Sequence, residues 1–325
     1  MKYFLLFSLF IFGICFHAHA QVEILTEDID NFWKAYDKLP DCKTKEDSIA
    51  AFQQYYIDAA TEGLIAFIKV RDFDAPEYYQ IVKKFPKFWA SIRPKTEQIK
   101  EMRPEIEKIY EDYARTYPGH KAPKICFAIG TLRTGGTTSR EFMLIGTEIV
   151  TADKEVDKSE LNKWLQSVMK DEAEVEGIVA HEYIHTQQRL GFGGIWAALN
   201  HRLLFMSLME GSCDFLAIQV TGASINQQII EYGEAHEAEL WQTFEKEMYR
   251  NKYDQWMYQG NNTPEGVPAD LGYFMGYKIS QAYYEQAEDK EQALRDILRI
   301  KNYKRFLKKS GYAEKVKRKY SQTSP

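Results

Sequence analysis

The segment Val179-Ala180-His181-Glu182-Tyr183-Ile184-His185-Thr186-Gln187-Gln188 decides both the fold expected of this 325-residue chain and its chemistry. It spells His-Glu-x-x-His inside a helical pattern, because apolar residues recur at helical spacing just upstream. Positions four apart share one face of a helix, so the imidazoles of His181 and His185 can meet at one metal ion. Glu182 follows the first histidine directly and is placed to act as a general base toward water.

A catalytic zinc site needs a third protein ligand, and Glu210 is the strongest candidate. With 24 residues between His185 and Glu210, the chain has room for a second helix that runs back across the first. Asp214 comes one helical turn after Glu210, where its carboxylate can accept the free ring N–H of a ligating histidine and fix its tautomer. His201 and His236 are alternative third ligands, although neither has an orienting partner in register.

Four residues near this pattern have simpler interpretations. Cys213 is interpreted as a small buried apolar residue, since free cysteine often packs in cores. Gly191, Gly193 and Gly194 follow the His-Glu-x-x-His helix and predict that it ends in a loop.

His-Glu-x-x-His followed by Glu-x-x-x-Asp resembles the signature of the gluzincin metallopeptidases. More closely, the chain resembles bacterial predicted zinc-dependent proteases of unknown function related to the gliding-motility lipoprotein family. The stretches that carry the resemblance are residues 117–149, 181–214 and 268–277. The resemblance implies a zincin-like core, one Zn²⁺ and peptide bonds as substrate, without identifying the substrate. Peptide deformylase also uses His-Glu-x-x-His, but its third ligand is an upstream cysteine in a Glu-Gly-Cys context that Cys126 lacks.

The expected fold is α+β and predominantly helical. Residues 1–20 are interpreted as a signal peptide, 21–116 as a helical region that packs on the core, and 117–325 as the zincin-like domain. Two strands are predicted, Ile125–Ile129 and Phe142–Val150, separated by a turn-rich segment around Gly135. By resemblance to gluzincins, the Phe142–Val150 strand would form the cleft edge to which a peptide adds. A purely structural hairpin remains the alternative.

The composition of the chain limits the kinds of partner that it is expected to bind. The net charge of −5 and the pI of about 5.9 argue against a nucleic-acid surface. The basic stretch 301–319 is interpreted as the solvated face of a terminal helix, with contact to a membrane or nucleic acid as the less favoured alternative. No segment after the signal peptide has an apolar run long enough to span a bilayer. Cys42, Cys126 and Cys213 remain after cleavage and do not define a disulfide framework.

The first residues predict export. Lys2, an apolar stretch and Ala18-His19-Ala20 have the organisation of a cleaved signal peptide, so the mature chain is expected to begin at Gln21 in the periplasm or outside the cell. Cys15 raises a lipoprotein alternative, but Ile14 before it is larger than the residue usual at that position. Soluble export is therefore favoured over lipid anchoring.

Two tyrosines are candidates for the group that stabilises the oxyanion of a hydrolysis reaction. Tyr273 and Tyr277 lie one turn apart in a predicted helix, and either phenol has the donor such an oxyanion requires. Packing of both in the core is an equally good interpretation.

These residues together predict an exported single-zinc hydrolase, most simply a peptidase that uses a metal-activated water with Glu182 as its base. The alternative is a non-catalytic zinc-fold binding protein or scaffold in bacterial surface machinery. The intact Glu182 favours the enzyme, because scaffolding needs no general base.

Overall fold

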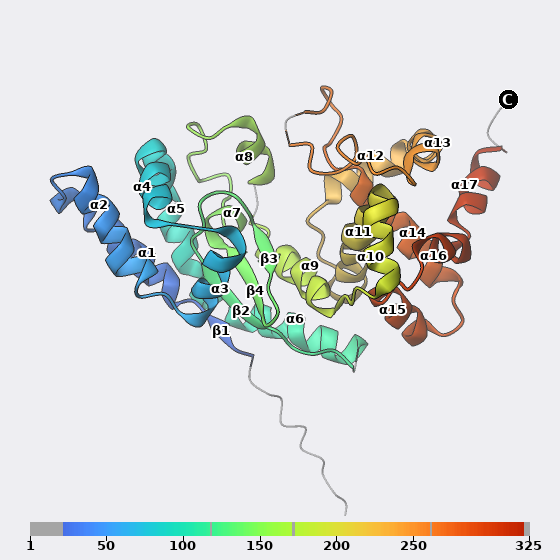
Figure 1. Ribbon diagram of the computed structural model, residues 1–325, viewed down its shortest axis with the longest axis horizontal. Helices are drawn as coiled ribbons and strands as arrows, with labels where there is room; N and C mark the ends of the chain where they lie inside the picture. Colours follow the sequence, from blue (N-terminus) through green and yellow to red (C-terminus); the bar gives the residue numbers. More distant parts are fainter. Residues whose placement is uncertain (1–21, 118, 171–172, 261, 322–325) are drawn as a thin grey trace, which may run out of the picture.

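The computed structural model describes residues 22–117, 119–170, 173–260 and 262–321. The protein is predominantly helical with one small mixed sheet, as predicted for an α+β fold (Figure 1). The interpreted signal peptide, with Lys2 and Cys15, lies outside the described residues.

The sheet has the strand order β1-β2-β4-β3. Its strands are β1 (Ile24–Leu25), β2 (Lys124–Ala128), β3 (Gly136–Thr138) and β4 (Phe142–Gly146). β1, β2 and β4 run parallel, whereas β3 is antiparallel to β4. All five residues of β4 are buried, because this strand is paired on both sides and its faces are covered by helices. β1 joins the N-terminal helical region to the sheet.

The prediction for the Phe142–Val150 strand is wrong in two respects, its length and its position in the sheet. The strand ends at Gly146, and the chain continues as the short helix α7 (Thr147–Val150). At this point Glu148 turns inward, where its carboxylate accepts hydrogen bonds from the backbone N–H groups of Gly130 and Leu132. The strand is also internal, so it does not form an edge; the edge strand is β3, within the segment that the sequence predicts as turns.

The region between β1 and β2 is helical, as predicted for the N-terminal part of the chain. Pro76, Pro86 and Pro104 stand at helix N-termini, where a missing N–H leaves no hydrogen bond unmade, but Pro94 lies inside a helix rather than at a boundary. The helices are α1 (Glu27–Tyr36), α2 (Lys45–Phe52), α3 (Glu62–Arg71), α4 (Ala75–Lys84), α5 (Pro86–Gln98) and α6 (Arg103–Thr116), with 3₁₀ turns at Leu39–Asp41 and Ile99–Glu101 and a π-helical turn at Gln53–Ile57.

Helix α9 (Val175–Gln187) carries the His-Glu-x-x-His pattern and lies between the sheet and the C-terminal helices (Figure 1). From the N-terminal region, Tyr113 of α6 stacks on Tyr183 with ring centroids 4.2 Å apart and donates a hydrogen bond to the Ala180 carbonyl, 2.8 Å away. The N-terminal helical region therefore packs on the helix that carries His181 and His185.

Helix α11 (Arg202–Thr221) is the second helix predicted after the pattern, and it packs against both α9 and α14 (Gly272–Gln286). Glycines permit the close approach of α11 and α14: a Cβ on Gly276 would lie 1.7 Å from the Ser207 carbonyl oxygen, and one on Gly211 would lie 2.3 Å from the Tyr273 carbonyl oxygen. The remaining helices are α8 (Lys163–Val168), α10 (Phe192–Asn200), α12 (Gln227–Ala235), α13 (Glu237–Glu247), α15 (Lys290–Leu298), α16 (Tyr303–Ser310) and α17 (Tyr312–Ser321).

Three further expectations from the sequence can be compared with the fold. The loop predicted after α9 is short, since α10 begins at Phe192 and contains Gly193 and Gly194. By length and composition alone α11 is apolar enough to cross a membrane, but Glu210 and Asp214 interrupt its apolar residues and most of the helix is buried in the fold. Cys42, Cys126 and Cys213 are all free thiols in the part of the chain that the structure describes.

Candidate metal centre

Helices α9 and α11 bring three donor atoms together. His181 Nε2 lies 3.1 Å from His185 Nε2, Glu210 Oε2 lies 3.1 Å from His185 Nε2, and the same carboxylate oxygen lies 3.4 Å from His181 Nε2. Ligand atoms about 2.0–2.2 Å from a tetrahedral zinc ion are themselves about 3.3–3.5 Å apart. The edges of this triangle, 3.1, 3.1 and 3.4 Å, lie within about 0.2 Å of that range, so only small side-chain adjustments would be needed to hold a zinc ion.

The other nitrogen of each imidazole has a hydrogen-bond partner. His181 Nδ1 lies 2.7 Å from Asp214 Oδ1, and the second oxygen of that buried carboxylate accepts a hydrogen bond from Asn226 Nδ2 at 2.7 Å. His185 Nδ1 lies 2.9 Å from Gln188 Oε1. Both contacts favour the proton on Nδ1, so that each Nε2 presents its lone pair toward Glu210.

Sequence reasoning missed the role of Gln188, although it lies three residues after His185. Its amide nitrogen donates to the Met209 carbonyl at 2.8 Å and to Ser212 Oγ at 3.1 Å, so this side chain fastens His185 to helix α11. The only sequence feature that points to this role is the position of Gln188, a polar residue within one helical turn of the candidate ligand His185.

The electrostatics of the site favour a cation. Burial lowers the pKa of His181, but the charge and hydrogen bond of Asp214 and the contact with Glu210 outweigh burial and hold that pKa well above its usual range. Burial likewise raises the pKa of Glu210, but the neighbouring His185 and His181 hold it well below its usual range. In the metal-free protein the ionised Glu210 carboxylate therefore favours protonation of the neighbouring imidazole pair, and a divalent metal would replace the bound proton.

Glu182 points toward the sheet. A Cβ on Gly136 of β3 would lie 2.7 Å from the Cγ and Oε1 atoms of Glu182, so this carboxylate packs directly on the edge strand. Burial raises the pKa of Glu182, an effect opposed by the positive charge of His185, His181 and Arg71. Arg71 of α3 was not indicated by any sequence pattern. It donates to Thr134 Oγ1 at 3.0 Å, and its buried Nε has no hydrogen-bond partner among the described residues.

The tyrosines occupy different positions. The Tyr273 ring stacks on the His181 ring with centroids 6.4 Å apart, and burial raises the pKa of its phenol well above the usual range. Tyr277 packs edge-to-face on Phe215, and among the described residues it makes no hydrogen bond to the three donors. Tyr258, which the sequence did not indicate, donates its hydroxyl proton to Glu210 Oε1 at 3.1 Å.

Backbone geometry explains how Tyr258 reaches the site. Its φ of 58° lies in the left-handed region, and the loop around it is held by reciprocal hydrogen bonds between Gln259 and Asp270. The residue is 59% exposed although its hydroxyl contacts Glu210. Burial of the phenol and the charge of Glu210 raise the pKa of Tyr258, so that it remains a protonated donor.

The alternative ligands do not complete the triangle. Cys213 Sγ comes within 3.4 Å of His185, but at Nδ1, behind the donor triangle, and it donates to the Met209 carbonyl at 3.2 Å. His181, His185 and Cys213 form only a looser group, with ligand atoms within 4.8 Å of one another. His201 contacts the Tyr249 carbonyl and His236 contacts the Tyr232 carbonyl, and neither forms a hydrogen bond with His181 or His185 in the part of the chain that the structure describes.

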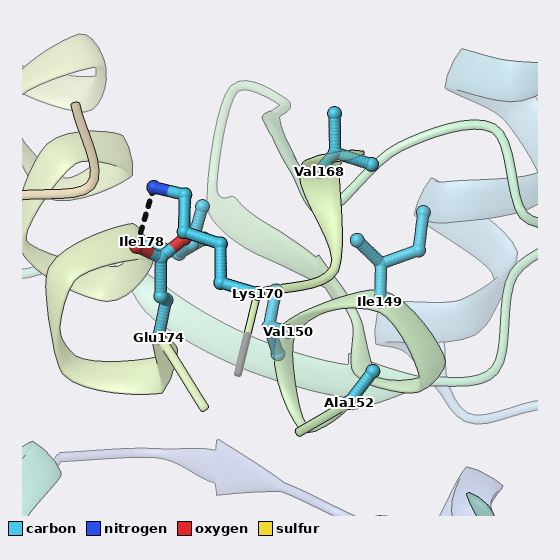
Figure 2. A pocket seen from close by; sticks show the side chains of 7 residues that line it. All are labelled: Ile149, Val150, Ala152, Val168, Lys170, Glu174 and Ile178. Carbon is cyan, nitrogen blue, oxygen red and sulfur yellow. Dashed lines mark hydrogen bonds and ion pairs between the residues drawn. The ribbon is translucent and has the colours of Figure 1, made fainter. Parts of the chain in front are cut away.

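A small cavity near the N-terminal end of α9 is not part of this site (Figure 2). It holds about 20 Å³, space for one water molecule, and its polar lining consists of the Lys170–Glu174 ion pair. None of the three donors lines it.

The fold and the site thus define a helical α+β protein with a His-Glu-x-x-His helix and a glutamate on a crossing helix. A model of the family described as gliding motility protein GldB matches residues 18–314, and the chain belongs to that family. The family is one of lipoproteins, which suggests the cell envelope and is compatible with the predicted export. Comparison with curated proteins and with solved structures found no significant match.

Proposed function

We propose that the protein is a zinc-dependent hydrolase of gluzincin type with a zincin-like core, acting on peptide bonds. One observation carries the proposal: the mutual distances of 3.1, 3.1 and 3.4 Å between His181 Nε2, His185 Nε2 and Glu210 Oε2. When bound there, zinc would supply Lewis-acid polarisation of a carbonyl and a lowered pKa for a water molecule.

Each neighbouring residue then has a task. Glu182 accepts the proton of the attacking water and passes it to the leaving amine, and its raised pKa suits that exchange. Asp214 and Gln188 hold the imidazoles in the required tautomer. The phenol of Tyr258 or of Tyr273 donates to the developing oxyanion. Tyr258 is the better placed, since its hydroxyl already reaches the ligand Glu210.

Strand β3 offers a place for an extended peptide. Gly146 donates its N–H to the Gly135 carbonyl and Ser139 donates to the Phe142 carbonyl, so by alternation Thr137 bonds to β4. The backbone groups of Gly136 and Thr138 then face the free edge. A peptide paired there would run beside Glu182, which packs on Gly136.

The test combines metal analysis with a peptide-library screen. The purified protein should hold about one zinc per molecule, with strong loss in His181→Ala, His185→Ala and Glu210→Ala. Glu182→Gln should keep the zinc and lose cleavage, because an amide cannot accept the water's proton. Equal zinc content in all four variants and wild type would refute the ligand set, and equal cleavage by wild type and Glu182→Gln would refute the mechanism.

A second function is favoured by the family itself, whose description concerns gliding motility. In this alternative the zinc fold serves as a binding or scaffold component of surface machinery. Zinc retained by both wild type and Glu182→Gln, with no cleavage by either and full motility supported by Glu182→Gln, would favour it.

A further inference from the structure

Helix α10, which links α9 to α11, presents an apolar ridge to solvent. The ridge consists of Leu190, Phe192, Ile195, Trp196 and Leu199, whose exposed fractions are 55, 94, 53, 52 and 69%. Four of them follow helical spacing on one face, whereas Gly194 and Ala197 on the opposite face are buried. Single exposed apolar residues are ordinary, but a contiguous ridge of this kind marks an interaction surface.

The surroundings of the ridge are basic. Residues 186–209 and 297–313 contain no aspartate or glutamate, and together they carry eight lysines and arginines. All eight are exposed, and none forms an ion pair within the described residues: Arg189, Arg202, Arg299, Lys301, Lys304, Arg305, Lys308 and Lys309. In a chain of net charge −5, this is a local excess of unneutralised positive charge.

The two acid-free segments pack against each other. Arg189 donates its backbone N–H to the Leu298 carbonyl at 3.0 Å, and a Cβ on Gly193 would lie 1.7 Å from the Lys301 carbonyl oxygen. Between them lies a hollow of about 600 Å³, lined by ridge residues together with Asn302, Tyr303 and Lys304. The apolar ridge and part of the basic rim therefore belong to one surface.

We propose that this surface docks on an anionic phospholipid bilayer. Phe192, Trp196 and Leu199 would enter the boundary between headgroups and acyl chains, while the surrounding lysines and arginines contact lipid phosphates. A protein partner would also cover apolar side chains, but two packed segments that carry eight cations and no carboxylate, with no carboxylate lining the hollow between them, match a uniformly anionic surface. This assignment replaces the interpretation of the basic stretch from Lys301 as a merely solvated helix face.

The test is cosedimentation of the expected mature chain, without lipid modification, with vesicles of phosphatidylglycerol and phosphatidylcholine or of phosphatidylcholine alone. Wild type should bind the anionic vesicles and lose binding as salt is raised. The double variant Phe192→Ser/Trp196→Ser should bind about tenfold or more weakly, since two large apolar side chains no longer enter the bilayer. Leu199→Ser alone should weaken binding in the same direction.

Matched controls separate the ridge from general effects. Ile65→Ser removes a comparably exposed side chain, 57% exposed on α3, and should bind as wild type does. Lys304→Glu should weaken binding, whereas Lys84→Glu should not, although both lysines lie over an aromatic ring and form no ion pair among the described residues. Melting temperature and zinc content check that each variant is folded.

Two results would overturn the proposal. One is binding of wild type to anionic vesicles that is no stronger than binding to neutral ones, or that is unchanged in both ridge variants. The other is sedimentation showing a wild-type dimer that the double variant abolishes, without vesicle binding, because the ridge would then be covered by a second copy of this chain.

Discussion

Replacing Asp214 by asparagine should weaken zinc binding about 10- to 100-fold without unfolding the protein. The carboxylate makes two hydrogen bonds, one from His181 Nδ1 and one from Asn226 Nδ2, each at 2.7 Å. Both partners are donors, and an asparagine side chain of the same shape has one acceptor oxygen and one NH₂ group. One of the two donors must therefore face another donor, and the negative charge that favours a cation is lost as well. The expected loss corresponds to about 1.4–2.7 kcal/mol of binding free energy.

The assay is zinc competition against a chelator of known affinity, with circular dichroism to confirm the fold. Asp112→Asn is the matched control, because Asp112 is also a buried carboxylate but pairs with Lys108 and Arg115 at the surface of α6. Its zinc affinity should equal that of wild type. The reasoning fails if Asp214→Asn binds zinc as tightly as wild type, or if Asp112→Asn loses as much affinity.

Three further predictions follow from particular contacts. Burial raises the pKa of Glu148 to about 7 from an ordinary 4.5, so the contribution of this group to the free energy of unfolding is greatest below pH 4.5 and is lost as the pH rises through 7. This loss is on the order of 3 kcal/mol. Glu148→Gln should remove this part of the pH dependence, as measured by urea unfolding midpoints across the same pH range. Gly211→Ala should lower stability by about 1–3 kcal/mol or more in urea unfolding, since its Cβ would meet the backbone of α14, and an unchanged midpoint would contradict the close helix crossing. Gly136→Val should keep zinc and lose hydrolysis because the new side chain displaces Glu182, whereas Gly135→Ala, whose Cβ is 3.4 Å from its nearest neighbour, should keep both.

The donor triangle was predictable because its parts are local in sequence. His181 and His185 are placed by one helix, and Glu210 and Asp214 by one turn of another, so only the crossing of the two helices had to be assumed. Helical periodicity carries this information directly. The general architecture, helices around a small sheet, follows from the same patterns.

The elements that sequence reasoning missed depend on distant contacts. β3 has three residues, and its glycine and threonines resemble a turn; it becomes a strand only by pairing with β4. Tyr258 reaches Glu210 from a loop in left-handed backbone geometry, with 47 residues between them in the sequence. The local sequence around β3 does not indicate its pairing with β4, and the local sequence around Tyr258 does not indicate its contact with Glu210.

The apolar ridge and the metal centre can be tested separately even though α10 connects the helices that carry His185 and Glu210. The ridge side chains point to solvent, and the attachment of α10 to the fold uses its other face, where Gly194 and Ala197 are buried. Removing Phe192 or Trp196 therefore takes little from the core and leaves the distances between the zinc donors unaffected. A ridge variant that loses vesicle binding but keeps zinc would assign the two surfaces different tasks, whereas loss of zinc in that variant would mean that α10 helps to position the donors.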